Sequence, residues 1–236
     1  KTAYEIKECD WSSDVCSSDL SWLEARLAEA GASFAIGLYG ENRDVYKGEQ
    51  FATAASPEWR SQHLGVDIFI AAGTPLHAPL AGTVLSVVDN ALPFDYGPTV
   101  ILEHRAGQDG PPFWTLYGHL ARETLERVKP GMAVAAGQRI GSIGDRDVNG
   151  GWAPHLHFQI ITDRLSQSGE FPGVGQPSLW PIWRAISPDP NLILRLAPES
   201  FTSAFGAVID QFVASKNSAA AAAAAQQLAV RAGISK

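Results

Sequence analysis

The stretch PHLHFQII at residues 154–161 decides the fold, because β-prone apolar residues surround two histidines that stand two positions apart. Residues i and i+2 of a β-strand point to the same face, so His155 and His157 reach one side of a sheet. Toward the N-terminus, further runs of this kind extend back to residue 66, separated by Gly and Pro: VDIFI, GTVLSVV, TVILEH, FWTLYGHL and RIGSIG. Such runs indicate antiparallel strands. The sequence therefore predicts a mainly β fold, an antiparallel β-sandwich or barrel-sandwich-like core with short flanking helices.

The segments on either side of this core differ from it in composition. Ser21 and Glu24 form a capping box before an apolar helical stripe that ends at Gly31, and short strands are expected at Phe34–Tyr39 and Val45–Tyr46. We expect these regions in chain order: an N-terminal flank at 21–50, the β-sheet core at 51–165, a Pro- and Gly-rich segment without regular elements at 166–200 that wraps the core or links onward, and an Ala-rich helical tail at 201–236.

Residues 1–20 have a different character. The run DWSSDVCSSDL resembles the reading-frame translation of a common sequencing adapter, and KTAYEI resembles that of the other adapter arm. We interpret Lys1 to Leu20 as a disordered, adapter-derived artefact, with the biological chain starting near Ser21 as part of a longer protein. Under this interpretation the two cysteines, Cys9 and Cys16, say nothing about redox compartment or metal binding.

Composition excludes several classes of protein. The chain has 236 residues, of which 45% are hydrophobic, as in an ordinary globular protein. Each apolar run is interrupted before it reaches the roughly 18 residues needed to cross a bilayer. The net charge of −7 and the scattered Lys and Arg residues provide no basic surface for nucleic acid. We therefore expect neither a membrane span nor a nucleic-acid partner.

The candidate chemistry lies in histidine and aspartate. Besides the His-x-His pair, His63 precedes Asp67 by four residues in HLGVD, and His119 ends the apolar run FWTLYGHL. Imidazole and carboxylate are good ligands for Zn²⁺, and two His with one Asp would leave a fourth position open, as in catalytic sites. We interpret His77, which lies between two prolines, and His104, which ends TVILEH, as structural or near-site residues.

These motifs, in this order and at these intervals, resemble the LytM and lysostaphin-type zinc metallopeptidases, the glycyl-glycine endopeptidase family. The resemblance runs from about His63 to Ile161 and also includes HLGVDIFIAAGTPLHAPLAGTVLSV and VKPGMAVAAGQRIGSIG. It implies a β-sandwich-like antiparallel core, zinc as cofactor and a peptide or peptidoglycan substrate. By resemblance His63, Asp67 and His157 hold the zinc, while His119 and His155 act catalytically on water and substrate.

Two features of the sequence concern the substrate and the cellular compartment of the protein. The loop GDRDVNGGWA before PHLHF is longer than the Ser/Thr/Gly loop of peptidoglycan-cleaving relatives. The flanks resemble a peptidase module that lies between a kinase-like phosphotransferase domain and a pyridoxal-phosphate aminotransferase in bacterial fusion proteins. A cell-wall hydrolase would belong to the cell envelope or periplasm, and a fusion module to the cytoplasm. Trp114, Tyr117 and Trp152 either line a substrate groove or belong to the core.

Two alternatives to a peptidase remain open at this point. APLAGTV followed by VKPGMAVAAGQRIGSIG also resembles the repeat of biotinyl and lipoyl carrier domains. Such a carrier needs a modifiable lysine at a hairpin tip, whereas Lys129 precedes Pro130 and opens the repeat, and a carrier leaves the histidines unexplained. The other alternative is a metal-binding but non-hydrolytic or regulatory module within a larger fusion enzyme.

Overall fold

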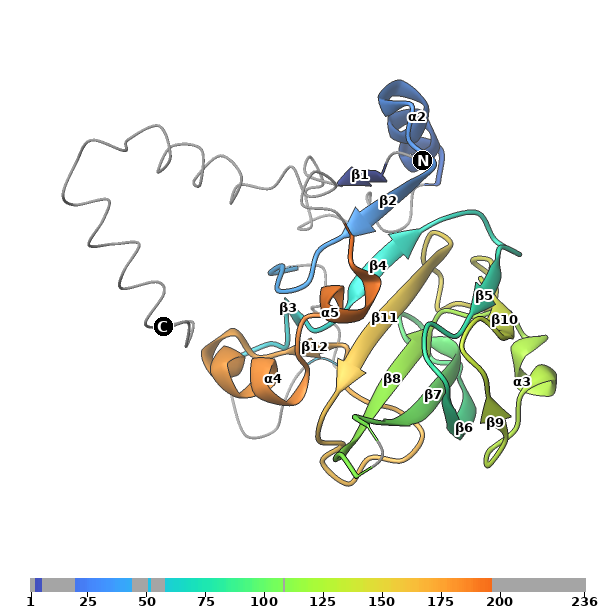
Figure 1. Cartoon of the computed structure of the whole chain (residues 1–236). Helices are drawn as coiled ribbons and strands as arrows, with labels where there is room; N and C mark the ends of the chain where they lie inside the picture. Colours follow the sequence, from blue (N-terminus) through green and yellow to red (C-terminus); the bar gives the residue numbers. More distant parts are fainter. Residues whose placement is uncertain (1–2, 6–19, 44–50, 52–57, 108, 197–236) are drawn as a thin grey trace, which may run out of the picture. The chain divides into compact units, whose positions relative to one another are not determined.

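The computed structural model describes residues 3–5, 20–43, 51, 58–107 and 109–196 (Figure 1). Its strands are β1 (Ala3–Glu5), β2 (Phe34–Gly37), β3 (Gln62–His63), β4 (Val66–Phe69), β5 (Pro75–His77), β6 (Gly82–Asn90), β7 (Gly97–Arg105), β8 (Pro112–Gly118), β9 (Ala133–Val134), β10 (Arg139–Ser142), β11 (His155–Ile161) and β12 (Val174–Gly175). Its helices are α2 (Leu20–Ala30), α3 (Thr124–Arg127), the 3₁₀ turn η2 (Pro177–Leu179), α4 (Trp180–Ile186) and α5 (Asn191–Leu194). Strands predominate, as the sequence predicts.

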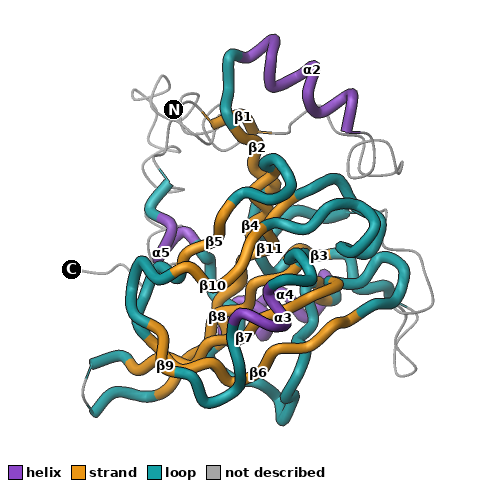
Figure 2. The backbone as a smooth tube through the Cα atoms, turned by 90° about the vertical axis from the view of Figure 1, so that its right-hand side faces the viewer, coloured by secondary structure: helices purple, strands orange, loops and turns teal. Residues whose placement is uncertain are grey.

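One eight-stranded sheet carries the fold, in the order β1-β2-β4-β11-β8-β7-β6-β9. Its neighbouring strands are antiparallel except for the parallel pair β1 and β2. Two-stranded sheets, β10-β5 and β12-β3, flank it. Helix α3 overlaps the strands in the tube view and contacts β10 and β6 (Figure 2). The antiparallel β core predicted from the sequence is confirmed.

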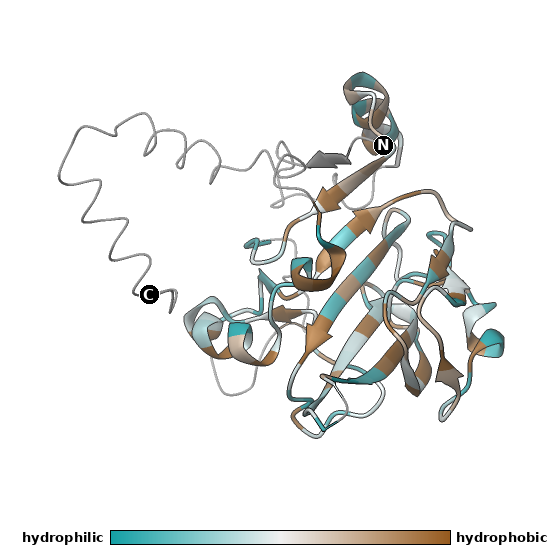
Figure 3. Cartoon of the chain, in the orientation of Figure 1, coloured by the Kyte–Doolittle hydropathy of each residue, from teal (hydrophilic) through white to brown (hydrophobic). Residues whose placement is uncertain are grey.

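The central strands bury both of their faces. Along β11 every residue is buried, and hydrophilic and hydrophobic residues alternate (Figure 3). The two faces contact different apolar clusters: Leu102, Tyr117 and Phe158 belong to one, whereas Leu116 and Ile161 belong to the other. Successive strand residues point to opposite faces of the sheet, so a strand that is buried on both faces needs apolar residues at odd and even positions alike. This explains the near-continuous apolar runs of β7 and β8.

The segment after β11 is more regular than predicted. The expectation that residues 166–200 lack regular elements was wrong, because β12, η2, α4 and α5 all lie there. Pro181 is the second residue of α4, where a missing backbone N–H costs no intrahelical hydrogen bond. Trp183 of α4 packs into the cluster that contains Phe171 and Leu64. The segment therefore covers one face of the sheet.

The helix and the first strand predicted for the N-terminal flank are present, although the helix begins at Leu20, so Ser21 lies inside it and not at its N-cap. Helix α2 spans Leu20–Ala30, and Gly31 follows with a φ of 60°, a left-handed conformation that suits a helix end. The predicted strand at Phe34–Tyr39 is present as β2, while Val45–Tyr46 lies outside the described residues. Within the stretch predicted to be an artefact, Ala3–Glu5 forms β1; the remainder of that stretch up to residue 19, like the tail 201–236, lies outside the described part. None of the described helices is long and apolar enough to cross a bilayer.

A core substitution tests the two-sided packing. Leu102 of β7 is fully buried in the cluster that contains Tyr117 and Phe158. Leu102→Ala should lower the free energy of unfolding by about 2–5 kcal/mol through lost burial and the cavity left behind. Leu192→Ala, at a side chain that is 69% exposed, should change it by less than about 0.5 kcal/mol. Urea denaturation followed by circular dichroism measures both, and equal effects would contradict this packing.

Candidate metal centre

The register of the sheet brings the predicted site residues together. His157 of β11 lies directly opposite Asp67 of β4 on one side and opposite Gly118 of β8 on the other. His119 follows Gly118, and His155 lies two residues before His157 on the same face. His63 comes from β3, and Gly65 then lets the chain pass His157 closely, since a Cβ there would come within 2.5 Å of the imidazole Cε1.

Three of these side chains converge on one point. His63 Nε2 lies 3.2 Å from His157 Nδ1 and 3.3 Å from Asp67 Oδ1. His157 Nδ1 and Asp67 Oδ1 are 3.0 Å apart. In the part of the chain that the structure describes, this trio is the group of His, Cys, Asp and Glu residues able to hold a metal ion. Ligand atoms about 2.0–2.2 Å from a tetrahedral zinc ion stand about 3.3–3.6 Å apart, so the trio approaches that spacing.

The hydrogen bonds of the two imidazoles show which nitrogens face the centre. His63 Nδ1 lies 2.8 Å from the Leu38 carbonyl oxygen, which only accepts, so Nδ1 carries the proton. Gln159 donates its amide to the Pro172 carbonyl and thereby turns its Oε1 toward His157 Nε2, at 2.9 Å. In the neutral rings, His63 Nε2 and His157 Nδ1 are then unprotonated. Two lone pairs and a carboxylate oxygen face one another with no donor between them, an arrangement that a cation stabilises.

The surroundings of His63 and Asp67 keep both side chains in the form that binds a metal. Burial lowers the pKa of His63 to about 4, assisted by the positive charge of Arg43, so the ring is neutral at physiological pH. Burial alone would raise the pKa of Asp67, but the neighbouring His63 and the Arg43 guanidinium outweigh it and hold that pKa well below its usual range. A metal ion therefore competes with no proton at His63 or Asp67 near neutral pH.

Arg43 fixes the second oxygen of Asp67. Its side chain is 2% exposed, and Nη1 donates a 2.6 Å hydrogen bond to Asp67 Oδ2. The same guanidinium contacts Glu41 Oε2 through Nε at 3.2 Å and Nη2 at 3.0 Å. Asp67 is thus left with Oδ1 alone for a metal, and Glu41 balances the buried positive charge.

His119 and His155 lie beside the trio, not within it. Their rings are 4.1 Å apart between centroids, and His155 Nε2 lies 4.0 Å from Asp67 Oδ1. Each Nδ1 faces a backbone carbonyl, of Asn149 and Ala153 respectively, so in each neutral ring Nε2 holds the lone pair. Burial lowers the pKa of both; for His119 the proximity of His155 lowers it further.

The backbone of His119 is strained. Its φ of 62° is a left-handed conformation that is costly for a side chain of this size, by about 1–3 kcal/mol. The N–H donates to the Tyr96 carbonyl at 2.8 Å, and the carbonyl accepts from the Gly144 N–H at 2.9 Å. Such strain is concentrated at functional sites.

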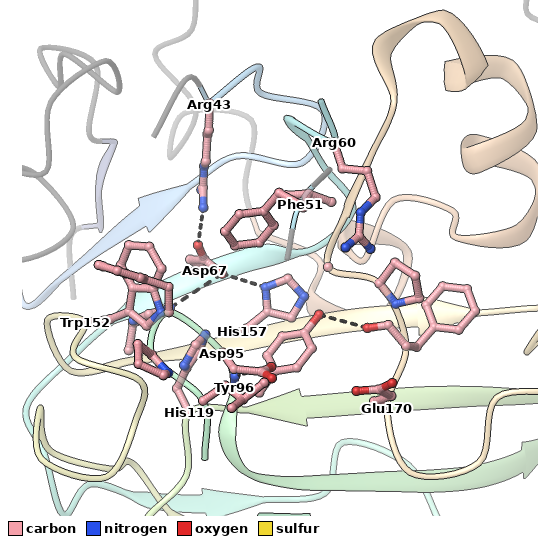
Figure 4. Close-up of a pocket in the computed structure, with 18 of the residues that line it drawn as sticks. Arg43, Phe51, Arg60, Asp67, Asp95, Tyr96, His119, Trp152, His157 and Glu170 are labelled. Atoms are coloured by element: carbon pink, nitrogen blue, oxygen red, sulfur yellow. Dashed lines mark hydrogen bonds and ion pairs between the residues drawn. The ribbon is translucent and has the colours of Figure 1, made fainter. Parts of the chain in front are cut away.

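A cleft of about 690 Å³ opens onto the centre, and Asp67, His119, His155 and His157 contribute to its wall. In the close-up, Asp67 and His157 lie between Trp152 on one side and Arg60 with Glu170 on the other (Figure 4). Trp152 therefore lines the cleft, as one of the two sequence interpretations allowed, whereas Trp114 and Tyr117 belong to the core. The open side of the trio thus faces space that a ligand can enter.

The two remaining histidines, His77 and His104, are not part of the trio. His104 bonds the Ala81 carbonyl through Nδ1 at 2.8 Å and Thr115 Oγ1 through Nε2 at 2.7 Å. His77 is exposed on β5.

The sequence analysis did not identify Arg43 and Gln159 as residues of the site. Gln159 could have been identified from the sequence, because the spacing His-x-His-x-Gln puts it on the same strand face as both histidines.

Comparison with known proteins agrees with this geometry. Residues 61–168 match the model of peptidase family M23. Over these residues the β-sheet core is similar to a peptidase domain of the M23 type. An uncharacterized metalloprotease of Haemophilus influenzae is 37% identical to the chain over 98 residues, which are 42% of this chain and 18% of that protein. The chain thus spans about a fifth of the length of this curated relative.

Two solved structures are also similar. The catalytic domain of the antimicrobial peptidase lysostaphin from Staphylococcus simulans has 25% identity and a TM-score of 0.42, with 71% of this chain and 98% of that chain covered. A zinc-containing peptidase from Vibrio cholerae has 27% identity and a TM-score of 0.35, with 46% and 29% covered. The resemblance to LytM-type peptidases inferred from the motifs is confirmed by the family match of the M23 domain.

A glutamine substitution tests the orientation of His157. Gln159→Leu removes the oxygen that accepts the proton of His157 Nε2, so Nδ1 is no longer held toward the centre. We expect zinc affinity to fall about 10- to 100-fold. Gln138→Leu is the control, since that side chain bonds only a local backbone N–H, of Ala135, at 2.9 Å. Competition with a chromogenic chelator measures both dissociation constants, and unchanged affinity in Gln159→Leu would refute the orienting role.

Proposed function

We propose that this M23 domain is a zinc-dependent endopeptidase that cleaves peptide bonds of the peptidoglycan cross-link type. The observation that carries the proposal is the convergence of His63 Nε2, Asp67 Oδ1 and His157 Nδ1 beside an open cleft whose wall includes Asp67 and His157. Three protein ligands with an accessible fourth position are the arrangement of catalytic zinc sites. In this proposal those three residues are the ligands.

Zinc held there would lower the pKa of a bound water toward 7 and polarise the scissile carbonyl. The chain supplies the groups that move protons. His119 and His155 are neutral near pH 7 because burial lowers their pKa, and each presents an unprotonated Nε2. One of the two accepts at Nε2 a proton from the attacking water and, once protonated, donates that proton to the leaving amine.

Bonds to main-chain carbonyls keep these two rings in place. His119 is held through Nδ1 by Asn149 at 2.9 Å, and His155 through Nδ1 by Ala153 at 2.7 Å. Both rings therefore keep the tautomer that leaves Nε2 free, without rearrangement during the reaction. Preorganised groups of this kind contribute more to catalysis than mobile ones, because no reorientation is needed in the transition state.

The peptidoglycan substrate is proposed from the motif resemblance. The cellular compartment of the domain is part of the same proposal. A cell-wall substrate implies the cell envelope or periplasm, whereas fusion to kinase-like and aminotransferase domains implies the cytoplasm. The competing proposal is a metal-binding module without turnover that regulates such a fusion enzyme. Zinc content alone does not separate the two, but hydrolysis of a peptide does.

The His-x-His pair provides the test. His157→Ala should lower zinc content and activity together, because it removes a ligand. His155→Ala and His119→Ala should keep zinc near one ion per chain while the rate falls about 10²- to 10⁴-fold. Zinc is measured after dialysis, and hydrolysis is measured with glycine-rich and cell-wall peptides. If His155→Ala were metal-free while His157→Ala kept its zinc, the two roles would be reversed.

A further inference from the structure

An exposed apolar surface lies on the cleft wall, next to the metal centre. Leu92 is 65% exposed and Phe94 is 46% exposed, and both line the cleft together with Trp152. The Phe94 and Trp152 rings pack edge to face, 5.3 Å apart between centroids. We call Leu92, Phe94 and Trp152 the apolar shelf. Large exposed apolar side chains beside a functional cleft indicate a binding surface.

The chain holds Phe94 on this surface at a cost. Its φ is 63°, a conformation that bulky side chains avoid and that glycine adopts freely. The Phe94 N–H donates to the Gly150 carbonyl at 2.9 Å, which ties the β6–β7 loop to the loop before β11. Gly150 permits this contact, because a Cβ there would collide with the Asp95 carbonyl oxygen. The strain and the close backbone packing therefore fix an aromatic ring where solvent can reach it.

The shelf is also coupled to the proposed catalytic histidine. Asn149 is fully buried; its side chain accepts the Trp152 N–H and donates to the Trp152 carbonyl, both at 3.0 Å. The Asn149 carbonyl oxygen lies 2.9 Å from His119 Nδ1. One residue thus sets both the position of Trp152 and the orientation of His119. A group bound on the shelf lies at a fixed distance from the reacting centre.

Charge distinguishes the two ends of the cleft. Arg60 and Glu170 lie on the side away from Trp152, beyond Asp67 and His157 (Figure 4). Asp95, the acidic residue that follows Phe94, turns its Oδ1 back to its own neighbour and accepts the Tyr96 N–H at 2.7 Å. The shelf therefore offers an apolar surface, while Arg60 and Glu170 lie toward the other end of the cleft.

From these observations we infer that the apolar shelf is a specificity subsite that takes a bulky apolar side chain of the peptide, next to the bond to be cleaved. A glycine at that position has no side chain to cover Leu92 and Phe94, whereas leucine or phenylalanine removes both apolar surfaces from water. The inference rests on the proposed peptidase function and deepens it. It makes the substrate a peptide with a bulky apolar residue on one side of the scissile bond, in contrast to an all-glycine bridge.

The test compares peptides that differ at one position. The zinc-loaded full chain is given quenched fluorescent peptides of an oligoglycine series in which each position in turn is Gly, Leu or Phe, and mass spectrometry locates the cleaved bond. We expect kcat/KM to be about 10- to 100-fold higher when Leu or Phe occupies one position beside the cleaved bond. Equal or faster cleavage of the all-glycine peptide would overturn the inference and leave the proposed function standing.

Two variants assign the preference to the shelf. Phe94→Gly suits the left-handed backbone, so it removes the ring without adding strain, and Leu92→Ser replaces the most exposed member. Each should reduce the Leu-to-Gly ratio of kcat/KM about 3- to 10-fold, while Leu192→Ala, an exposed leucine on α5, leaves the ratio unchanged. A ratio that survives in both shelf variants would place the preference elsewhere and overturn the inference.

If no peptide is cleaved, the proposed function is refuted, and peptide binding then tests the subsite by itself. The same Leu and Gly peptides are then titrated into the zinc-loaded chain and followed through the amide signals of Phe94 and Gly150 by NMR. Tighter binding of the Leu peptide, lost in Phe94→Gly, supports the subsite. Equal dissociation constants for the two peptides contradict it.

Discussion

The pairing of Asp67 with His157 across β4 and β11 is the constraint on which the rest of the site depends. Direct opposition in an antiparallel register puts the two side chains on one face, with Oδ1 and Nδ1 3.0 Å apart. A shift of one residue would send His157 to the other face of the sheet. The two-sided core prevents that shift, because it would also bring Gln159 into the apolar cluster around Phe158. Packing that stabilises the fold therefore also keeps the centre assembled.

Assembly of these groups has an electrostatic cost, and the chain offsets it locally. Asp67 lies among three imidazoles in a buried region, and the Arg43 guanidinium occupies its second oxygen while Glu41 compensates Arg43. The His63 ring stays neutral, and carbonyl or amide oxygens orient the imidazoles, as Leu38 does for His63 and Gln159 for His157. In the neutral rings, the two imidazole nitrogens and Asp67 Oδ1 are thus left as acceptors that face one another. In the proposed function a divalent cation completes this set.

Much of this could be predicted from the sequence, for identifiable reasons. The β core follows from apolar runs with a two-residue period, and the His-x-His spacing alone puts His155 and His157 on one face. The approach of His63 to that pair depends on a turn at Gly65 and on the pairing of β3 with β12, which no local pattern encodes. Arg43 lies 24 residues before the aspartate that it contacts, so its role depends on tertiary structure. Helix α4 does not follow from the local sequence, because Pro and Gly usually break regular elements, although proline is compatible with a first helical turn.

The measurement that tests the central claim most directly is a crystal structure of the zinc-loaded full chain with anomalous scattering recorded at the zinc edge. Our account predicts one zinc ion about 2.0–2.2 Å from His63 Nε2, Asp67 Oδ1 and His157 Nδ1, with Asp67 monodentate and the fourth position turned toward the cleft. His119 and His155 should lie near that fourth position without ligating the ion. An ion bound by His119 or His155 in place of His63 or His157, or a site closed by a fourth protein ligand, would contradict it.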